Sequence, residues 1–216
     1  MIIDSPSLLK HPDFQYLSDI VTALEKVDPQ YFSWYKHKPA DDGTISEVIQ
    51  KSNEERVFAY ELYHQIRKIM DTKPIPNRYI GVHLNGEAIK DDNFFTTLYK
   101  GLSTLYDSIK TDKCNRKMPD LVLHKDPGSI KKEGQIYLAE VKMGDNAKAL
   151  NDLLKLTMFE NSGLNFDLYI FIYVGKTIDE LKNELKKIDL SILSKNIVCA
   201  CVKHQQAKCY TLGELI

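Results

Sequence analysis

Three charged residues lie at one end of two neighbouring apolar segments. Asp120 is near the start of PDLVLH (119–124), and Glu140 and Lys142 are near the end of QIYLAEVK (135–142). Both segments alternate and are rich in β-branched or aliphatic residues, which is typical of strands. The DPGS sequence between them has turn chemistry. The sequence therefore predicts a long-looped antiparallel hairpin whose open end carries two carboxylates and an ammonium group.

The expected register of this hairpin brings the three charges together. If His124 pairs with Ile136, Asp120 lies opposite Glu140, and directly opposed Cβ atoms are about 4.5–5.5 Å apart. Lys142 is two residues beyond Glu140 and therefore points from the same face of the sheet. Two carboxylates at this spacing can share one hard cation, and Mg²⁺ and Mn²⁺ prefer such oxygen ligands.

The combination of Pro119-Asp120 with Glu140-Val141-Lys142 resembles the PD-(D/E)xK nuclease superfamily, the fold of many restriction endonucleases and junction resolvases. The E-x-K spelling also occurs twice within 180–186, on a predicted surface helix, and Pro12-Asp13 repeats the other half at a predicted helix start. Only the copy in 119–142 has both halves on successive predicted strands, in an order that brings them together.

The resemblance covers residues 46–175 and implies an α/β (α+β) fold. This fold is a restriction-endonuclease-like αβββαβ core with a mixed central sheet flanked by helices. The corresponding predicted elements are a helix at 46–70, a strand at 78–84 and the two hairpin strands at 119–124 and 135–142. A helix at 147–160 and a strand at 167–174 follow. The last strand is the most apolar and should be central.

Further predicted elements surround this core. They are a helix at 94–109, which departs from the family pattern, a helix at 178–188, a strand at 196–203 and a short strand or turn at 208–212. An N-terminal helical appendage at 1–42, with a helix at 11–27, precedes the nuclease-like domain at 43–216.

The resemblance implies a metal-dependent phosphodiesterase that acts on nucleic acid, with DNA favoured over RNA. Asp120, Glu140 and the Val141 carbonyl would bind Mg²⁺ or Mn²⁺. Lys142 would position the attacking water or stabilise charge on the phosphorus, and it would keep its proton beside two carboxylates.

A glutamate on the first core helix often supplies another acidic group to the metal site in this superfamily, and Glu55 is the best match for that role. Glu55 falls in the middle of the apolar stripe of the predicted helix, which consists of Val48, Ala59, Leu62, Ile66 and Ile69. A carboxylate in that position is costly unless it has a partner. The alternative is a rotated or half-buried helix, in which case Glu54 is the reserve residue.

Basic residues flank the predicted hairpin and would neutralise the phosphates of a nucleic acid. They are Lys113, Arg116 and Lys117 before Pro119, and Lys131 and Lys132 in the hairpin loop. A merely solvated loop explains these residues equally well. The aromatic and basic segment at 31–38 is a second ambiguous feature. It can stack on bases, but we favour packing of the N-terminal segment onto the main domain.

Composition sets the outer bounds of these expectations. The chain has 216 residues and a formal net charge of −1, so it exerts no global attraction on nucleic acid, although a basic face can coexist with acidic ligands. No stretch approaches the ~18 apolar residues of a membrane span, and the N-terminus lacks the pattern of a secretory signal. We expect a cytoplasmic protein without membrane association, and homodimer formation is compatible with this composition.

Three of the four cysteines and one histidine form a second cluster with possible metal-binding spacing. Cys199, Cys201, His204 and Cys209 spell a zinc-like pattern, whereas Cys114 is separate. Structural zinc sites usually place their ligand pairs on tight turns. Burial of strand cysteines as small apolar residues is commoner and is the favoured interpretation.

Two other classes of function remain open. One is a catalytically silent nuclease-like domain that acts as a nucleic-acid-binding or structural subunit. The complete set of Asp120, Glu140 and Lys142 argues against it. The other is a small-molecule hydrolase, or a metal-independent protein in which these charges form only a salt-bridge cluster. A metal ion that binds only the folded state would raise its stability, whereas a salt bridge needs none.

Overall fold

The structure is a computed structural model of the whole chain. It describes residues 5–32, 34–39, 45–50, 55–73, 78–86, 119–125, 134–143, 149–161, 165–186 and 190–216.

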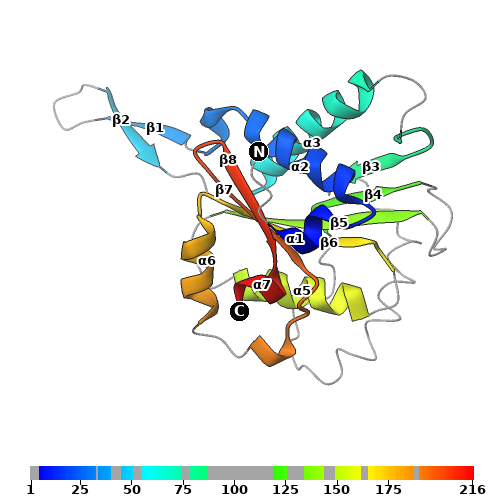
Figure 1. Cartoon of the computed structure of the whole chain (residues 1–216). Helices are drawn as coiled ribbons and strands as arrows, with labels where there is room; N and C mark the ends of the chain where they lie inside the picture. The colour runs from blue at the N-terminus through cyan, green and yellow to red at the C-terminus, as the bar shows by residue number, and fades with distance from the viewer. Residues whose placement is uncertain are drawn as a thin grey trace, which may run out of the picture.

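A six-stranded mixed sheet forms the centre of the molecule (Figure 1). Its strands are adjacent in chain order: β3 (His83–Gly86), β4 (Leu121–His124), β5 (Gln135–Met143), β6 (Leu168–Val174), β7 (Val198–Lys203) and β8 (Gln206–Thr211). Strands β5, β6 and β7 run parallel, and the other neighbours are antiparallel. Every residue of β6 is buried, so the prediction that this strand is central is confirmed. The α/β class with a mixed sheet is likewise as predicted.

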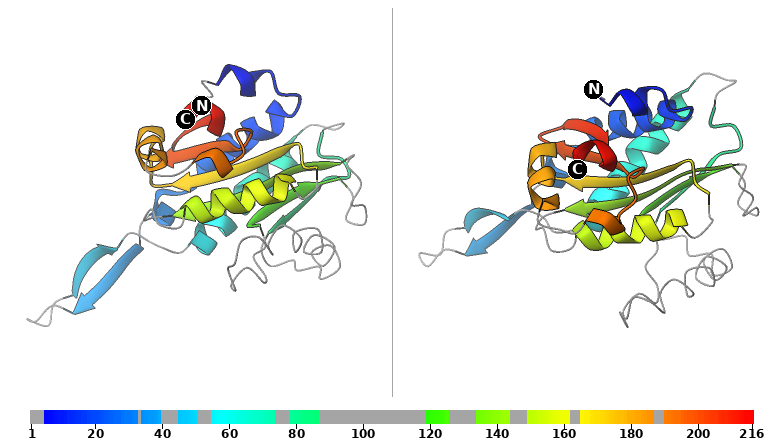
Figure 2. Two further views of the ribbon diagram at one scale, coloured as in Figure 1. Left: turned by 90° about the horizontal axis from the view of Figure 1, so that it is seen from below. Right: turned by 60° about the horizontal axis from the view of Figure 1, so that its bottom comes forward.

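Helices cover both faces of the sheet, as Figure 2 shows from two further directions. Helices α2 (Phe14–Lys26) and α3 (Glu55–Thr72) pack on one face. Helices α5 (Ala149–Asn161), α6 (Ile178–Leu185) and α7 (Leu212–Leu215) pack on the other. The short elements α1 (Pro6–Leu9), η1 (Pro29–Phe32) and η3 (Leu190–Ile192) complete the described helices. Within the described residues, no helix is long and apolar enough to cross a membrane.

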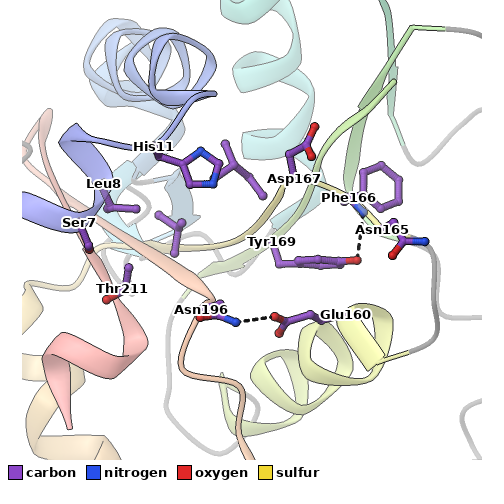
Figure 3. Close-up of a pocket in the computed structure, with 12 residues that line it drawn as sticks. Ser7, Leu8, His11, Glu160, Asn165, Phe166, Asp167, Tyr169, Asn196 and Thr211 are labelled. Carbon is purple, nitrogen blue, oxygen red and sulfur yellow. Dashed lines mark hydrogen bonds between the residues drawn. The ribbon is translucent and has the colours of Figure 1, made fainter. Parts of the chain in front are cut away.

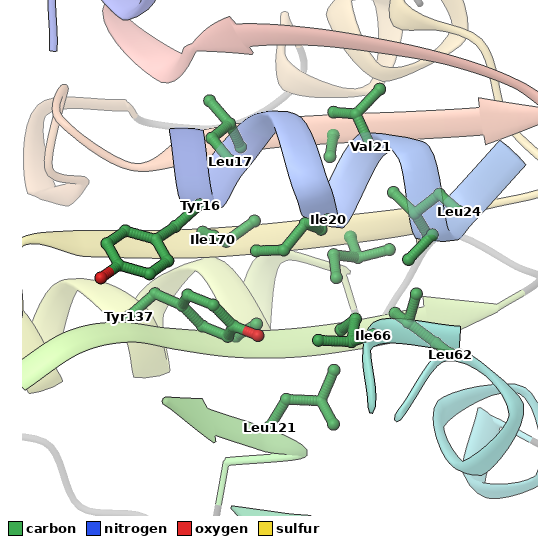
Figure 4. Close-up of a cluster of buried hydrophobic side chains, with 14 of the residues drawn as sticks. Tyr16, Leu17, Ile20, Val21, Leu24, Leu62, Ile66, Leu121, Tyr137 and Ile170 are labelled. Carbon is green, nitrogen blue, oxygen red and sulfur yellow. The ribbon is translucent and has the colours of Figure 1, made fainter. Parts of the chain in front are cut away.

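Helix α2 belongs to the main hydrophobic core. Its Leu17, Ile20 and Leu24 are buried against Leu62 and Ile66 of α3 and against the sheet (Figure 4). These residues recur at helical spacing, so the apolar face of α2 is continuous and covers β8 and its neighbours. The predicted domain boundary after residue 42 lies outside the described residues and remains a prediction.

A two-stranded hairpin replaces the start of the predicted helix at 46–70. Strand β1 (Trp34–Pro39) pairs antiparallel with β2 (Ile45–Gln50), and α3 begins only at Glu55. The prediction was therefore wrong for residues 46–50. Ile45, Val48 and Ile49 have helical spacing, but β-branched residues fit a strand better when a partner strand is present. The hairpin projects from the body of the molecule (Figures 1 and 2).

The predicted strand at 78–84 is also displaced along the chain. Residues 78–81 form a turn, and β3 begins at His83 and extends to Gly86. Gly81 has a φ of +68°, a value that glycine adopts without steric cost. This turn is held in place by contacts to α2 that the local sequence pattern does not reveal.

Those contacts converge on Asp19, a buried residue of α2. Lys73 Nζ lies 3.2 Å from Asp19 Oδ1, and Arg78 forms an ion pair with Asp19 Oδ2. The Tyr79 hydroxyl donates a hydrogen bond of 2.6 Å to the same oxygen. Burial and this hydrogen bond raise the pKa of Tyr79, so its hydroxyl remains a donor. The cluster joins α2, the end of α3 and the turn before β3.

Replacing Asp19 with alanine is expected to lower the free energy of unfolding by about 2–3 kcal/mol, because two cations and a buried hydroxyl lose their shared acceptor. Urea denaturation would measure the change. Asp71→Ala is the matched control, since Asp71 is 66% exposed and forms an i,i+4 pair of 3.6 Å with Arg67. Its expected cost is below ~1 kcal/mol. Equal effects of the two substitutions would contradict a structural role for the Asp19 cluster.

Candidate active site

Strand β5 places Glu140 and Lys142 on the face of the sheet that α5 covers. Side chains alternate along a strand, and the adjacent residues Ala139 and Val141 belong to the core on the opposite face. Glu140 and Lys142 are only 3% and 5% exposed. Charged side chains are rarely buried to this extent unless they are paired. Two charged side chains whose burial costs free energy thus lie on one face of a central strand.

Strand β4 brings Asp120 to the same place. Leu121 pairs with Ala139, and Asp120 N–H donates a hydrogen bond of 3.1 Å to the Ala139 carbonyl. Val141 N–H in turn donates to Asp120 Oδ2 at 2.7 Å. The Asp120 carboxylate is therefore fixed to the backbone of β5, between the positions of Glu140 and Lys142.

The hairpin register follows the prediction at this end only. The pairs from Leu121 to Leu123 have the expected offset, and its continuation sets Asp120 opposite Glu140. The register shifts between Leu123 and His124, so His124 pairs with Gln135 rather than with Ile136. The shift is a bulge-like irregularity at the loop end of the hairpin, and it leaves the site end unaffected.

Glu140 forms a buried ion pair with a lysine of α5. Lys155 Nζ lies 2.6 Å from Glu140 Oε1, and the side chains are 10% and 4% exposed. Burial raises the pKa of Glu140 well above its usual range, the charge of Lys155 opposes this shift, and the charge of Asp120 adds to it. The effect of Asp120 means that the two carboxylates repel each other through a poorly solvated space.

Lys142 is held by carboxylates from two helices on opposite faces of the sheet. Its Nζ lies 2.5 Å from Oε1 of Glu55, the first residue of α3, and 3.7 Å from Oδ2 of Asp152 on α5. Glu55 therefore joins the cluster through its contact with Lys142. Within the described residues, this is its one recorded contact with another predicted site residue. The apolar stripe of α3 is buried at Ala59, Leu62, Ile66 and Ile69, whereas Val48 lies on β2.

Sequence reasoning missed the two residues of α5 that complete this network, Asp152 and Lys155. They are three residues apart and therefore share one side of the helix. Lys155 also lies 5.8 Å from the centre of the Phe159 ring. The available signal was a lysine within an otherwise apolar run, LLKL, on a helix that must cover a charged strand. Such a lysine needs a buried partner.

Several predicted site residues cannot be placed. Glu54 and the basic residues predicted to bind phosphate lie outside the described residues; these are Lys113, Arg116, Lys117, Lys131 and Lys132. The predicted helix at 94–109 and Cys114 also lie there. Of the aromatic segment at 31–38, Tyr31 and Phe32 pack against the main core, with the rings of Phe32 and Phe58 5.2 Å apart.

The cysteines do not gather at one point. Cys199 and Cys201 belong to the core on the α5 side, and Cys209 belongs to the core on the other face. His204 lies in the exposed turn between β7 and β8. Burial raises the pKa of Cys209 to about 12, which disfavours the thiolate that a metal requires. These positions agree with the favoured interpretation of buried apolar cysteines.

The donors of the candidate site suit a hard cation better than a soft one, because they are carboxylate oxygens. Within the described ranges, no group of three or more His, Cys, Asp or Glu side chains is arranged to hold a metal ion. A pair such as Asp120 and Glu140 therefore needs the Val141 carbonyl and water to complete a coordination shell. Mg²⁺ commonly binds in this way, with one or two carboxylates and several waters.

A separate cavity of about 430 Å³ lies at the opposite end of the parallel strands (Figure 3). It is lined by the starts of β6 and β7, by Glu160 of α5 and by His11. Asn196 Nδ2 donates a hydrogen bond of 2.9 Å to Glu160 Oε1 at its wall. Leu168 of this wall pairs with Tyr137, whereas Lys142 pairs with Tyr173 at the other end of β6. The cavity contains none of the predicted site residues.

Comparison of the chain with protein-family models, with curated proteins and with solved structures finds no match. The geometry of the site is therefore the basis of the function proposed below.

Proposed function

We propose that this protein is a metal-dependent nuclease that hydrolyses phosphodiester bonds of nucleic acid, with DNA as the favoured substrate. The observation that supports the proposal is the contact between the Asp120 carboxylate and the backbone of Val141, at 2.7 Å. It sets Asp120 beside the two charged side chains of β5, Glu140 and Lys142. The neighbouring strands β4 and β5 thereby bring two carboxylates and the ammonium group of Lys142 together at one end of the hairpin.

The order of elements is a second support. Among the described residues, helix α3, strands β3, β4 and β5, helix α5 and strand β6 follow one another as helix, three strands, helix and strand. The first three strands are antiparallel neighbours, and β6 joins in parallel. This arrangement is the one expected for the restriction-endonuclease-like αβββαβ core, which we propose for the residues between α3 and β6.

Each site residue has a distinct part in the proposed reaction. Asp120, Glu140 and the Val141 carbonyl would hold Mg²⁺ or Mn²⁺, which when bound neutralises phosphate charge and activates a water molecule. Lys142 is oriented by Glu55 and Asp152, and its ammonium group can donate hydrogen bonds to the attacking water or to a phosphate oxygen. The basic residues predicted before β4 and in the hairpin loop would bind the flanking phosphates.

The ion pairs favour one second candidate. Lys155 contacts Glu140 and Lys142 contacts Glu55, so these four charges have partners within the protein. A catalytically silent nuclease-like domain, acting as a nucleic-acid-binding or structural subunit, could use the same charges as a salt-bridge cluster. The two candidates differ in whether a divalent cation binds the folded protein.

We expect purified protein to cleave DNA in the presence of Mg²⁺ or Mn²⁺ and to lose this activity in EDTA. The assay would use plasmid, linear and single-stranded DNA together with RNA. The same ions should raise the unfolding temperature, since a cation at 100 times its Kd stabilises the folded state by about 2.7 kcal/mol. Glu140→Gln is the control for both readouts. Metal-independent stability with no cleavage of any substrate would favour the silent domain.

A further inference from the structure

Lys155 is the most deeply buried cation of the site that the proposed reaction does not use. It lies in the middle of α5, next to Leu156 and two residues after Leu153, both of which are buried, and its side chain is 10% exposed. Burying an ammonium group is costly unless a carboxylate compensates it. Glu140, with its Oε1 at 2.6 Å, supplies that compensation.

This ion pair occupies the carboxylate that the metal needs. A divalent cation bound by Glu140 would lie close to the present position of the Lys155 ammonium group. Two cations at such a separation repel strongly, because few water molecules screen them in a buried site. A metal bound at Oε1 of Glu140 would therefore have to displace the Lys155 ammonium group, which lies 2.6 Å from that oxygen.

We propose that Lys155 is a built-in counter-ion that occupies Glu140 in the metal-free protein and that a divalent cation must displace. The inference depends on the proposed function, since it presupposes a metal at Glu140. It assigns to Lys155 the role of setting the metal concentration at which the site becomes loaded. Lys155 is thus a positioning residue and not a catalytic one.

The two lysines of the site have different partners, and this separates their roles. Lys142 contacts Glu55 and Asp152, neither of which belongs to the pair of β-strand carboxylates. Lys155 contacts Glu140 itself. Removing Lys155 should consequently change metal affinity, whereas removing Lys142 should mainly change the chemical step.

Calorimetric titration of Lys155→Met with Mn²⁺ tests the proposal. Methionine keeps the length and the apolar stem of lysine without its charge, so we expect the variant to bind Mn²⁺ at least about tenfold more tightly than the wild type. In EDTA its unfolding temperature should be lower than that of the wild type, because Glu140 has lost its partner. Added Mn²⁺ should raise that temperature more in the variant than in the wild type.

Two controls separate competition from simple loss of stability. Lys155→Arg keeps the charge and should bind Mn²⁺ within about threefold of the wild type. Lys73→Met removes a lysine 3.2 Å from another buried carboxylate, Asp19, at the far end of α3, roughly 25 Å along the helix from Glu55. It should lower stability without altering Mn²⁺ affinity.

The outcomes distinguish this inference from the proposed function. If Lys155→Met binds Mn²⁺ no more tightly than a wild type that does bind it, Lys155 is only structural and the inference is overturned, while the nuclease proposal stands. A wild type that binds no divalent ion overturns both. If Lys155→Met fails to fold in EDTA, refolding in Mn²⁺ followed by titration with a chelator gives its affinity instead.

Discussion

Substituting Lys142 with methionine is expected to lower the rate of DNA cleavage by about 10²–10⁴-fold while the Mn²⁺ affinity changes by less than about threefold. Positioned proton-transfer and charge-stabilising groups typically contribute effects of this size. Lysine is not a ligand of hard cations, and Lys142 contacts Glu55 and Asp152 rather than Asp120 or Glu140. Its contribution should thus be confined to the transition state.

Single-turnover cleavage assays beside calorimetric Mn²⁺ titration would measure both quantities on the same preparations. Lys73→Met is a suitable comparison, because Lys73 is also ion-paired but lies at the other end of α3. It should cleave at the wild-type rate. Wild-type cleavage by Lys142→Met would show that the mechanism proposed here is wrong, even if the metal still binds.

The hairpin could be predicted from the sequence because the residues that determine it are close together in the chain. Alternating strands on either side of a turn determine which end is open, and the offset of the Leu121–Leu123 pairs follows from that. The position of Asp120 beside Glu140 needs nothing further. The exception is His124, where an irregularity shifts the register by one residue. Bulges of this kind depend on the loop and leave little trace in the hydrophobic pattern.

The start of α3 and the position of β3 depended on partners far away in the chain. Residues 45–50 have helical apolar spacing, yet they pair with 34–39. Residues 78–81 look like part of a strand, yet Asp19 holds Arg78 and Tyr79 in a turn. In both cases the local sequence favours one type of secondary structure only weakly over another. A tertiary contact therefore decides which type forms.

The α5 residues were missed for a related reason. Asp152 and Lys155 acquire meaning only when the helix is packed on β5, because their partners are Lys142 and Glu140. Read alone, a D-x-x-K pair on a helix suggests an ordinary surface ion pair. The buried charges of β5 were nevertheless visible in the sequence, and a buried charge requires a partner from the element that covers it. A search of the covering helix for complementary charge could have identified both residues.

Asp120→Asn is expected to have opposite effects on the metal-free protein and on the metal-bound protein. Asparagine keeps an oxygen that can accept the hydrogen bond of Val141 N–H, which is 2.7 Å long in the structure, but it removes the negative charge. Since the Asp120 charge raises the pKa of Glu140 by repulsion, its removal should stabilise the metal-free fold or leave it unchanged. Loss of a ligand charge should weaken Mn²⁺ binding by at least about tenfold and cleavage by at least about 10²-fold.

Thermal unfolding in EDTA and at increasing Mn²⁺ concentrations would measure these opposite effects on the unfolding temperature. The variant should unfold at the same or a higher temperature than the wild type in EDTA, and at a lower temperature in saturating Mn²⁺, because only the wild type gains the full binding free energy. Asp120→Ala separates the backbone contact from the charge, as it loses both and should be less stable than Asp120→Asn in EDTA. If Asp120→Asn gains as much stability from Mn²⁺ as the wild type does, Asp120 is not a metal ligand. Its role is then confined to joining β4 to β5 through the Val141 amide.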